Sequence, residues 1–533
     1  MSLQQRWNEE IAGDVRVWGE VNLPPEDPYR VIGDHINELL DEDDFAFMYS
    51  PLGRGAVCPV MLALISVFQA REKLGDRAAA AMARRRLDCL YALHLPLTWG
   101  GFHHSDLSNF RKRVLTHEAE ALIFEKVLAL VQGLGFLKGV QMQRSDSTHI
   151  LSCTERLGRL ELVWETLRLA LQAIECYGGA WCPTRIPEVF RQTYSTRRGT
   201  WHLKYGEMLE ELVRVGQDGL WLLAQLDTSA PPEVLAQPEI ATFRTVWAQR
   251  FEVSAEAEGD QETVVLKKQG GRGKGKEQIV TPYDADVRWF QKRDTEWEGY
   301  KLHVTETVDE TVSVQFITDV DLVAANAGDS EAVADIQTRL ITRDLAPSEH
   351  YVDQGYTSGR NLAESAARGI ELVGPIGLDT SGKPEGYRLA DFILDAETRE
   401  ATCPAGHTVP LILKGDPPGS QGSAADFHTH CATCPARAVC APGPQGRRIR
   451  TQPYHQLREA RRAEQQTAAF KERIKRRSAV EGTISELVRC YGVRHARYRG
   501  QAKVRLQILF AGAAANLNRL SRVLSLQPVP HPS

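Results

Sequence analysis

Apolar residues recur every three or four positions along the first quarter of the chain, the spacing of one buried helix face. The pattern predicts helices over residues 58–71 and 76–93, and a further helix that ends near residue 134. Asp76 stands at the start of the second helix, where its carboxylate is expected to cap free backbone N–H groups. The first 136 residues are therefore predicted to form a helical domain.

The pattern changes after residue 139. Strands are predicted over 139–150, 300–304, 311–320, 350–353 and 370–373, and helices over 329–342 and 359–368. Residues 157–247 are mostly helical by period with a break at 178–187, and the Gly-rich residues 256–277 are predicted to be a linker. Strands that alternate with helices indicate an α/β fold with a mixed sheet. An irregular Gly/Pro/Cys-rich stretch and a long helix are expected to follow the last strand.

These shifts divide the chain into six predicted parts. They are a helical N-terminal domain (1–136), a first core strand (137–155), a helical insertion with a linker (156–280), the remaining α/β core (281–375), a small Cys-rich module (376–450), and a basic helix with a C-terminal helix (451–525).

Composition narrows the class of protein. The 533 residues are 42% hydrophobic and 25% charged, which is typical of a globular protein. Residues 57–70 are too short for a membrane span, which needs about 18 apolar residues, and the N-terminus lacks the apolar stretch of a signal peptide. We therefore expect a cytoplasmic protein with no membrane partner. Its ten cysteines are then expected as thiols or metal ligands rather than disulfides.

The net charge of −5 conceals a basic block. Residues 447–505 contain 17 Lys or Arg against 5 Asp or Glu, so this block favours a phosphate-binding surface. A solvated helix whose cations offset acidic neighbours is the alternative. The N-terminal helices also carry cations and are compatible with a helix-turn-helix. The side chains expected to contact double-stranded DNA are Arg84, Arg85, Arg86, Arg111, Lys112, Arg113, Arg473, Arg477, Arg489, Arg494, Arg497 and Arg499.

Three carboxylates are candidates for a functional site, because such sites in α/β folds form at the ends of strands. Asp146 ends the first core strand, Asp353 ends the fourth, and Glu481 lies in the basic helix. If the fold brings them together, they form an oxygen-rich site for divalent cations. The alternatives are that each Asp shapes a turn and that Glu481 pairs with Arg477 four residues earlier.

Other acids are assigned structural roles. Asp329 and Ser330 are expected to cap the helix that begins there, and Asp319 and Asp321 are expected in a loop.

Four of the ten cysteines fall within 38 positions. Cys403, Cys431, Cys434 and Cys440 have the residue types of a structural Zn²⁺ site, which would order a loop poor in apolar residues. His407, His428 and His430 are possible substitute ligands. Four unrelated thiols, or a redox pair at Cys431 and Cys434, are the alternatives.

The three acids lie in the motifs Arg144-Ser145-Asp146-Ser147-Thr148, Tyr351-Val352-Asp353-Gln354-Gly355-Tyr356 and Arg477-Ser478-Ala479-Val480-Glu481. These motifs resemble those of bacterial insertion-sequence transposases of the DDE class. The segments 297–304, 498–500 and 516–520 resemble the second core strand and the C-terminal helix of that family. Ile474 stands where relatives often have Tyr, and Val488, followed by Arg489, stands where they have Lys. Gly482 is unfavourable inside a helix and is expected to mark either a local break or a tight packing contact.

The resemblance implies a ribonuclease-H-like core in which Asp146, Asp353 and Glu481 bind Mg²⁺ or Mn²⁺. It also implies binding of terminal inverted repeats, strand cleavage and transfer, and a homodimer that pairs the two element ends. Two alternatives use the same residues: a metal-dependent nuclease without strand transfer, and a DNA-binding protein that has lost catalysis.

Overall fold

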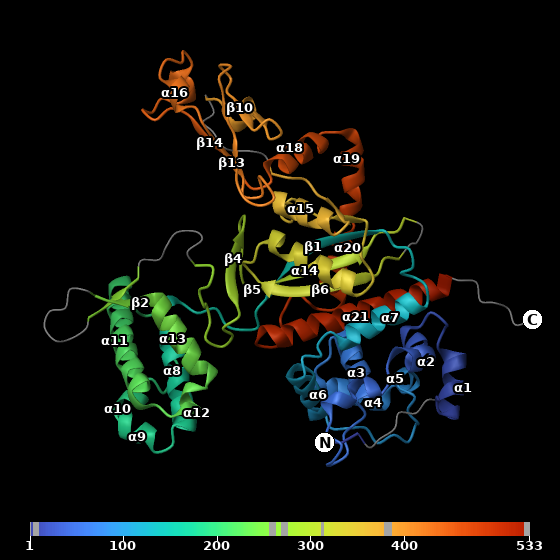
Figure 1. Cartoon of the computed structure of the whole chain (residues 1–533). Helices are drawn as coiled ribbons and strands as arrows, with labels where there is room; N and C mark the ends of the chain where they lie inside the picture. The colour runs from blue at the N-terminus through green and yellow to red at the C-terminus, as the bar shows by residue number, and fades with distance from the viewer. Residues whose placement is uncertain are drawn as a thin grey trace, which may run out of the picture.

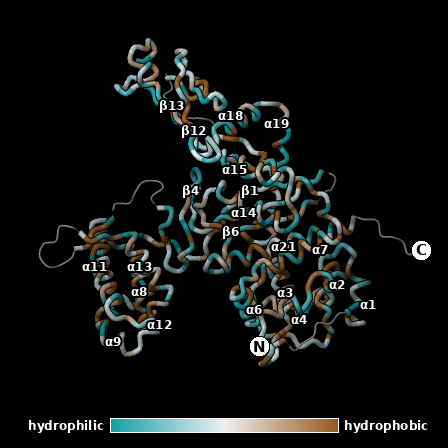
Figure 2. The backbone as a smooth tube through the Cα atoms, viewed as in Figure 1, coloured by the Kyte–Doolittle hydropathy of each residue, from teal (hydrophilic) through white to brown (hydrophobic). Residues whose placement is uncertain are grey.

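A computed structural model describes residues 2–3, 10–254, 263–267, 275–310, 314–377 and 386–526. The N-terminal part is helical (Figure 1). Its elements are α1 (Gly13–Asn22), α2 (Pro28–Leu39), η1 (Asp43–Met48), α3 (Pro59–Arg71), α4 (Asp76–Arg85), α5 (Leu87–Ala92), α6 (Ser105–Thr116) and α7 (Leu122–Gly133). The apolar helix α3 is buried along most of its length. Figure 2 colours the backbone by the hydropathy of each residue.

Two details of this part differ from the prediction. The helix expected over 76–93 is broken at Arg86, whose backbone is extended between α4 and α5. Asp76 is not a helix cap, because its carboxylate instead accepts hydrogen bonds from Gln69 (2.7 Å) and from the buried Arg111 (2.6 Å). A buried guanidinium needs a charged partner more than an exposed helix end needs a cap.

The core of the molecule is a mixed six-stranded sheet with the order β4-β5-β1-β7-β8, and β6 also pairs with β5. The strands are β1 (Met142–Leu151), β4 (Arg288–Lys292), β5 (Thr295–Thr307), β6 (Ile317–Ala324), β7 (Glu349–Tyr351) and β8 (Glu371–Val373). β1 is antiparallel to β5 and parallel to β7, and β7 is parallel to β8. The predicted α/β class with a mixed sheet is confirmed.

Helices cover both faces of this sheet. They are α14 (Asp329–Thr342), α15 (Gly359–Ala367), α20 (Val480–Cys490) and α21 (Gln501–Leu526). Thr305 of β5 pairs with Asp319, which accepts a hydrogen bond from Arg339 of α14. The next residue of β5, Glu306, accepts a hydrogen bond from Thr483 of α20. Since successive strand residues point to opposite faces, α14 and α20 lie on opposite sides of the sheet. α21 joins the core of the N-terminal helices to that of the sheet.

The prediction that Asp319 and Asp321 lie in a loop is wrong. Both are buried in β6. Asp319 forms ion pairs with Arg339 (2.8 Å) and Arg343 (2.7 Å), and Asp321 with Arg505 (2.8 Å). These guanidinium groups supply the charge compensation that lets two carboxylates enter a strand.

A second helical body lies between β1 and β4 in the chain and has its own hydrophobic core (Figure 1). Its elements are α8 (Arg159–Tyr177), α9 (Trp181–Arg185), α10 (Glu188–Thr193), α11 (Tyr205–Ser229), α12 (Pro232–Leu235), α13 (Pro238–Arg250), β2 (Phe251–Val253) and β3 (Val264–Leu266). Much of the predicted linker over 256–277 lies outside the described residues. Within it, however, β3 is a strand that pairs with β2.

The prediction that the Cys-rich stretch is irregular is wrong. This stretch is built from two small three-stranded sheets with their own core. Its elements are η2 (Leu389–Asp391), β9 (Ile393–Asp395), β10 (Glu400–Thr402), β11 (Thr408–Pro410), β12 (Ile412–Leu413), β13 (Ser423–Asp426), α16 (His428–Cys431), α17 (Arg437–Cys440) and β14 (Arg448–Arg450). The expected long basic helix is divided into α18 (His455–Glu464), α19 (Ala468–Arg473), η3 (Ile474–Arg477) and α20.

Candidate functional site

Asp146 and Asp353 come from neighbouring parallel strands. Met142 pairs with Glu349 and Arg144 pairs with Tyr351, and continuing this register by two residues sets Asp353 beside Asp146. Asp353 follows the end of β7, where its carboxylate accepts the Gly355 N–H at 2.7 Å. Two acids more than 200 positions apart in the sequence therefore meet at one point of the sheet.

Glu481 is connected to this point through Arg477. The Arg477 guanidinium contacts the Asp146 carboxylate and lies 3.3 Å from Glu481 Oε1. The i,i+4 ion pair considered for Glu481 is thus present, and the same cation also reaches Asp146. Gly482 neither breaks α20 nor makes a tight contact, since a Cβ there would meet nothing within 4 Å. Both explanations offered for that glycine are wrong.

The electrostatics of Asp146 reflect its burial. Loss of solvent raises the pKa of the Asp146 carboxyl, and the charge of Asp353 adds to this, while Arg477 opposes it. The Asp146 carboxylate also accepts the Ser147 N–H at 2.8 Å. A buried carboxylate beside a second carboxylate is electrostatically costly, so the site favours a bound cation.

Asp329 belongs to this neighbourhood, and its predicted capping role is wrong. The residue before α14 is Gly328, and no side chain caps the helix. The Asp329 carboxylate instead accepts hydrogen bonds from Ser147 Oγ (3.1 Å) and Lys301 Nζ (3.0 Å). A Cβ at Gly355 would lie 2.9 Å from Asp329 Oδ2 and 3.0 Å from Asp353 Oδ1. Asp329 and Asp353 therefore flank the same turn.

The sequence of β5 contains polar residues at buried positions, and these could have indicated the residues around Asp329. Tyr300 to Thr307 are all buried, so the polar residues Lys301, His303 and Thr305 needed partners inside the fold. They find them: Lys301 in Asp329, His303 in the Tyr356 hydroxyl (2.6 Å), and Thr305 in Ser145 (2.6 Å).

A buried ionic network holds α20 against the sheet. Glu306 accepts hydrogen bonds from Arg144 (2.7 Å), Thr483 and, on α21, Arg519 (3.2 Å). Arg519 also bonds Glu486 at 2.7 Å. Because Thr483 and Glu486 lie in the first two turns of α20, this network fixes the position of the helix from which Glu481 projects.

The twelve cations expected to contact DNA fall into two groups. Arg86, Arg111, Arg473 and Arg477 are held by acids, while Arg113 and Arg494 donate to the carbonyls of Met48 and His149. The exposed members are Arg84, Arg85, Lys112, Arg489, Arg497 and Arg499, of which Arg497 also donates to the carbonyl of Leu74. Lys112 lines a groove of about 560 Å³ between α6 and α21 together with Tyr498 and Lys503.

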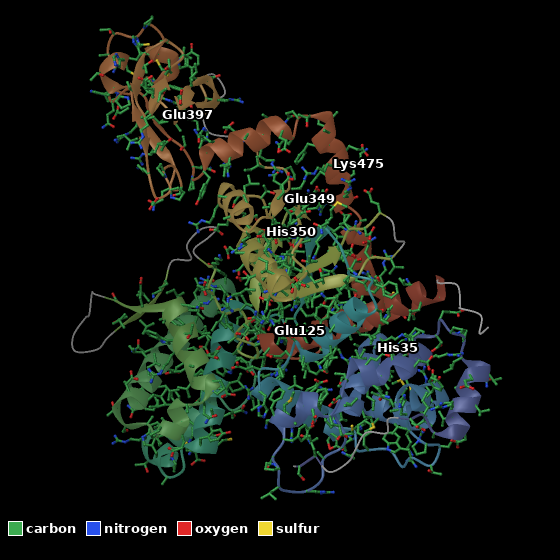
Figure 3. All side chains as sticks on the ribbon, turned by 45° about the vertical axis from the view of Figure 1, so that its right-hand side comes forward. His35, Glu125, Glu349, His350, Glu397 and Lys475 are labelled. Carbon is green, nitrogen blue, oxygen red and sulfur yellow. The ribbon has the colours of Figure 1, made fainter. Side chains whose placement is uncertain are left out.

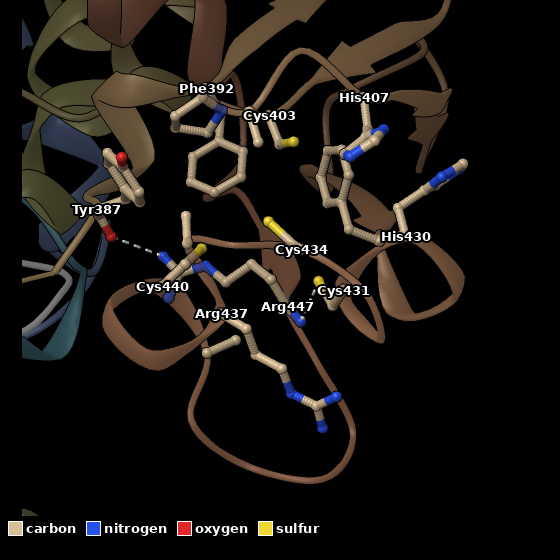
Figure 4. A pocket seen from close by; sticks show the side chains of 15 residues that line it. Tyr387, Phe392, Cys403, His407, His430, Cys431, Cys434, Arg437, Cys440 and Arg447 are labelled. Carbon is tan, nitrogen blue, oxygen red and sulfur yellow. Dashed lines mark hydrogen bonds between the residues drawn. The ribbon is translucent and has the colours of Figure 1, made fainter.

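The four clustered cysteines line one small cavity (Figure 4). Cys403 and Gly406 close one tight turn, and Cys431 and Cys434 close another. The Arg447 N–H donates to Cys431 Sγ at 3.3 Å, and His407 stacks on His430. Burial, followed by the neighbouring thiols, raises the pKa of Cys440, with Arg447 opposing. All ten cysteines are free thiols.

Neither the three acids nor the four cysteines form a complete metal-coordination site among the described residues. Across the described residues, no group of three or more His, Cys, Asp or Glu side chains is positioned to hold one ion together. At the acidic site Arg477 stands between Asp146 and Glu481, and the Glu481 side chain is 65% exposed.

Two family models match the chain. One is described as "Transposase DDE domain" and covers residues 402–521, and the other is described as "Transposase domain (DUF772)" and covers residues 19–113. These matches support an insertion-sequence transposase of the DDE class. The resemblance noted in the sequence is thereby confirmed. Comparison with curated proteins and with solved structures gives no match.

The two matched segments lie in different parts of the chain. The DDE match includes the four clustered cysteines, Glu481 and most of α21, and the second match covers much of the N-terminal helical part; Asp146 and Asp353 lie outside both. The families indicate DNA transposition, and DDE transposases generally use Mg²⁺ or Mn²⁺. No helix within the described ranges has the length and apolarity to cross a membrane.

Proposed function

We propose that this transposase binds the terminal inverted repeats of its element, cleaves DNA there, and joins the freed 3′ ends to target DNA. The observation that carries the proposal is that Asp353, just after the end of β7, comes beside Asp146 on the adjacent parallel strand β1, with Glu481 connected to Asp146 through Arg477. The strand order β6-β5-β1-β7-β8 supports a ribonuclease-H-like core.

The carboxylate donors fit a hard divalent cation, which prefers oxygen ligands. Asp146, Asp353 and Glu481 would hold Mg²⁺ or Mn²⁺. The bound ions would supply activation of the attacking oxygen and neutralisation of charge at the phosphate.

The chain's own residues prepare this centre. Asp353 is oriented by the Gly355 N–H, and Asp146 by the Ser147 N–H. Arg477 compensates the charges of Asp146 and Glu481. With a divalent cation bound to these carboxylates, the Arg477 guanidinium would be available for a bidentate contact with a DNA phosphate, a geometry for which arginine is well suited.

The exposed cations support binding of DNA along a path outside the centre. Arg497 and Arg499 lie on the loop that pairs with the end of β1, where Leu151 bridges His495. Lys112 and Lys503 continue this path into the groove between α6 and α21. Contacts of this kind are made to phosphates and position the duplex without reading its sequence.

Two element ends must be held together for transposition, so we propose that the active form is a homodimer on DNA in the cytoplasm. We further propose that Cys403, Cys431, Cys434 and Cys440 bind one structural Zn²⁺. Four thiols around one cavity are a suitable donor set for tetrahedral zinc. The six-part division of the chain is retained as part of this proposal.

The decisive experiment replaces Asp146 by Asn, which preserves shape but removes the charge. With duplex DNA that carries the inverted repeats flanking the gene, wild type is expected to cleave in Mg²⁺. Asp146→Asn is expected to bind the same DNA with cleavage reduced at least about 100-fold. Asp344→Asn, at an exposed turn, is the matched control. Undiminished cleavage by Asp146→Asn would contradict the proposal.

The two alternatives separate in a second assay. A pre-cut 3′ end is mixed with plasmid target, and joined products are sought. Cleavage without joining would identify a nuclease, and binding without either reaction would identify a protein that has lost catalysis.

A further inference from the structure

Asp329, the first residue of α14, is a fourth acid beside the three proposed to bind metal. Its carboxylate oxygen Oδ1 accepts hydrogen bonds from Ser147 Oγ at 3.1 Å and from Lys301 Nζ at 3.0 Å. Ser147 follows Asp146 on β1, and Lys301 belongs to the neighbouring strand β5. One oxygen of Asp329 therefore binds side chains of two paired strands, next to Asp146.

The second oxygen of this carboxylate, Oδ2, faces the turn that holds Asp353. A Cβ placed on Gly355 would lie 2.9 Å from Asp329 Oδ2 and 3.0 Å from Asp353 Oδ1. Since both oxygens are about 3 Å from one point, they are at most about 6 Å apart. A Mg²⁺ ion with its bound waters can span such a distance, because its ligands stand about 2 Å from it. The spacing of Asp329 and Asp353 therefore suits one hydrated cation.

A buried phenol shows that Asp329 and the other acids share one electrostatic environment. Tyr356 directly follows Gly355 and is fully buried. Burial raises the pKa of Tyr356 well above its ordinary value, and the charge of Asp329 is the next cause. The charges of Asp146 and Asp353 raise this pKa further. The carboxylate of Asp329 is thus close enough to act together with those of Asp146 and Asp353.

The partner of Asp329 is a buried cation. The Lys301 side chain is 8% exposed, and that of Asp329 is 15% exposed. Burying two charges costs desolvation that their attraction often does not recover, and such pairs can often be replaced by apolar residues without loss of stability. The pair is therefore weak evidence for a role in stability. Its position beside Asp146 and Asp353 favours a role in the metal centre.

Asp329 reaches the centre from the side opposite to Glu481. Asp329 begins α14 and Glu481 lies in the first turn of α20, and these helices cover opposite faces of the sheet. Each acid has its own cation, since Lys301 pairs with Asp329 and Arg477 pairs with Glu481. The two remaining acids of the centre thus lie between two acid–base pairs, one on each side.

We propose that Asp329 is a positioning residue of the divalent-cation centre and holds Asp146 and Asp353 at the spacing at which they bind the ion. The inference rests on the proposed function, because that function assigns the ion to these carboxylates. Asp329 acts through its hydrogen bond to Ser147 and through Oδ2, which accepts a hydrogen bond from a water on the ion. Lys301 keeps the carboxylate in this orientation. Groups that support metal ligands in this way change metal affinity about 10- to 100-fold when they are replaced.

The test measures Mn²⁺ binding to the full chain without DNA. Electron paramagnetic resonance reports free Mn²⁺ during a titration and gives the dissociation constant, and the binding that Asp146→Asn abolishes is assigned to the centre. Asp329→Asn keeps the shape of the side chain but removes its charge, and is expected to bind Mn²⁺ about 10- to 100-fold more weakly than wild type. Asp335→Asn, at an exposed position on the same helix, is the matched control and should keep the wild-type affinity.

A double variant separates positioning from folding. Asp329→Asn leaves the buried Lys301 without its charged partner, which destabilises the fold by itself. Asp329→Asn/Lys301→Met removes both charges, and thermal unfolding in EDTA compares its stability with that of wild type. If Asp329 only neutralised Lys301, the double variant would regain the wild-type Mn²⁺ affinity. A positioning role predicts instead that the affinity stays as low as in Asp329→Asn.

The outcomes distinguish this inference from the proposed function. Wild-type Mn²⁺ affinity in Asp329→Asn, or a full return of affinity in the double variant, would overturn the positioning role even if cleavage depends on Asp146. Weaker binding in both variants would support the role even if no DNA joining is found, since the titration contains no DNA. Absence of Asp146-dependent Mn²⁺ binding in wild type would overturn the proposed metal centre and this inference with it.

Discussion

Arg477 contacts the carboxylate of Asp146, although 331 positions separate the two residues. The same guanidinium reaches Glu481, so one cation compensates two of the three acids proposed to bind metal. A divalent cation and Arg477 would therefore compete for the same carboxylate oxygens. The ion pair thus describes the metal-free site and predicts how that site responds to metal.

Replacing Arg477 by Gln is expected to destabilise the metal-free protein by about 1–3 kcal/mol, because buried Asp146 loses its charged partner. Mg²⁺ should restore part of this loss, so its stabilising effect is expected to be larger in Arg477→Gln than in wild type. Thermal unfolding in EDTA and in Mg²⁺ measures both values. Arg476→Gln, next in sequence and paired with the exposed Glu310, is the control. Equal Mg²⁺ shifts in both variants would show that Arg477 and the cation do not share ligands.

A methyl group at Gly355 tests the spacing of Asp353 and Asp329. The new Cβ would lie within about 3 Å of an oxygen of each carboxylate, so Gly355→Ala must displace at least one of them. Misplacement by a fraction of an ångström is expected to slow cleavage by roughly 10-fold or more, with little change in DNA affinity. Single-turnover cleavage and a binding titration give the two numbers. Gly133→Ala, where a Cβ meets nothing within 4 Å, should cleave at the wild-type rate.

The helix over 329–342 could be predicted from the sequence, but the partners of its first residue, Asp329, could not. Periodicity predicted the helix over 329–342 with both ends correct, because the spacing of apolar residues within the segment is enough to identify an amphipathic helix. It assigned Asp329 to a cap because a cap is the local role for an acid at a helix start. The true partners, Ser147 and Lys301, are brought there by pairing of β1 with β5, which no local pattern encodes.

The register of strand pairing accounts for the other acids whose positions the sequence alone did not predict. The parallel pairing of β1 with β7 aligns Asp146 with Asp353, and the motifs identified both acids without predicting that alignment. Asp319 and Asp321 were misassigned for the converse reason: their strand is buried, and only the distant Arg339, Arg343 and Arg505 make two acids tolerable there.

Stability should depend on pH through His350, which is fully buried in β7 at the centre of the molecule (Figure 3). Burial lowers its pKa to about 4, while in the unfolded chain it titrates near its ordinary value of 6.5. Between these values the unfolded state binds more protons, so stability falls as pH drops from 6.5 toward 4 and is constant above. The loss from this residue is on the order of 3 kcal/mol.

Urea unfolding at several pH values measures this slope. His350→Gln is expected to reduce this slope but not abolish it, because burial also lowers the pKa of His149 and of His303 to about 4. The variant keeps a hydrogen bond to Ser145, the partner of His350 Nε2 at 2.7 Å. The exposed His117→Gln should reproduce the wild-type slope. A His350→Gln profile as steep as that of wild type would assign the pH dependence to other groups.

The cysteine cavity predicts bound zinc. Purified protein is expected to contain about one Zn²⁺ per chain, because four thiolates around one cavity satisfy the tetrahedral preference of the ion. Elemental analysis of wild type and of Cys431→Ser measures this, and the variant is expected to lose the metal. Cys490→Ser, at the exposed end of α20, is the control and should retain it.

Chelation adds a structural readout to this prediction. The Cys-rich part has only a small hydrophobic core, so removing its metal is expected to make residues 386–450 the first segment cut by a protease. A redox pair at Cys431 and Cys434 would behave differently: the protein would contain no zinc, and oxidation would consume two thiols in a thiol titration. Absence of zinc from the wild-type protein would therefore refute the structural metal site, and the thiol titration would then test the redox alternative.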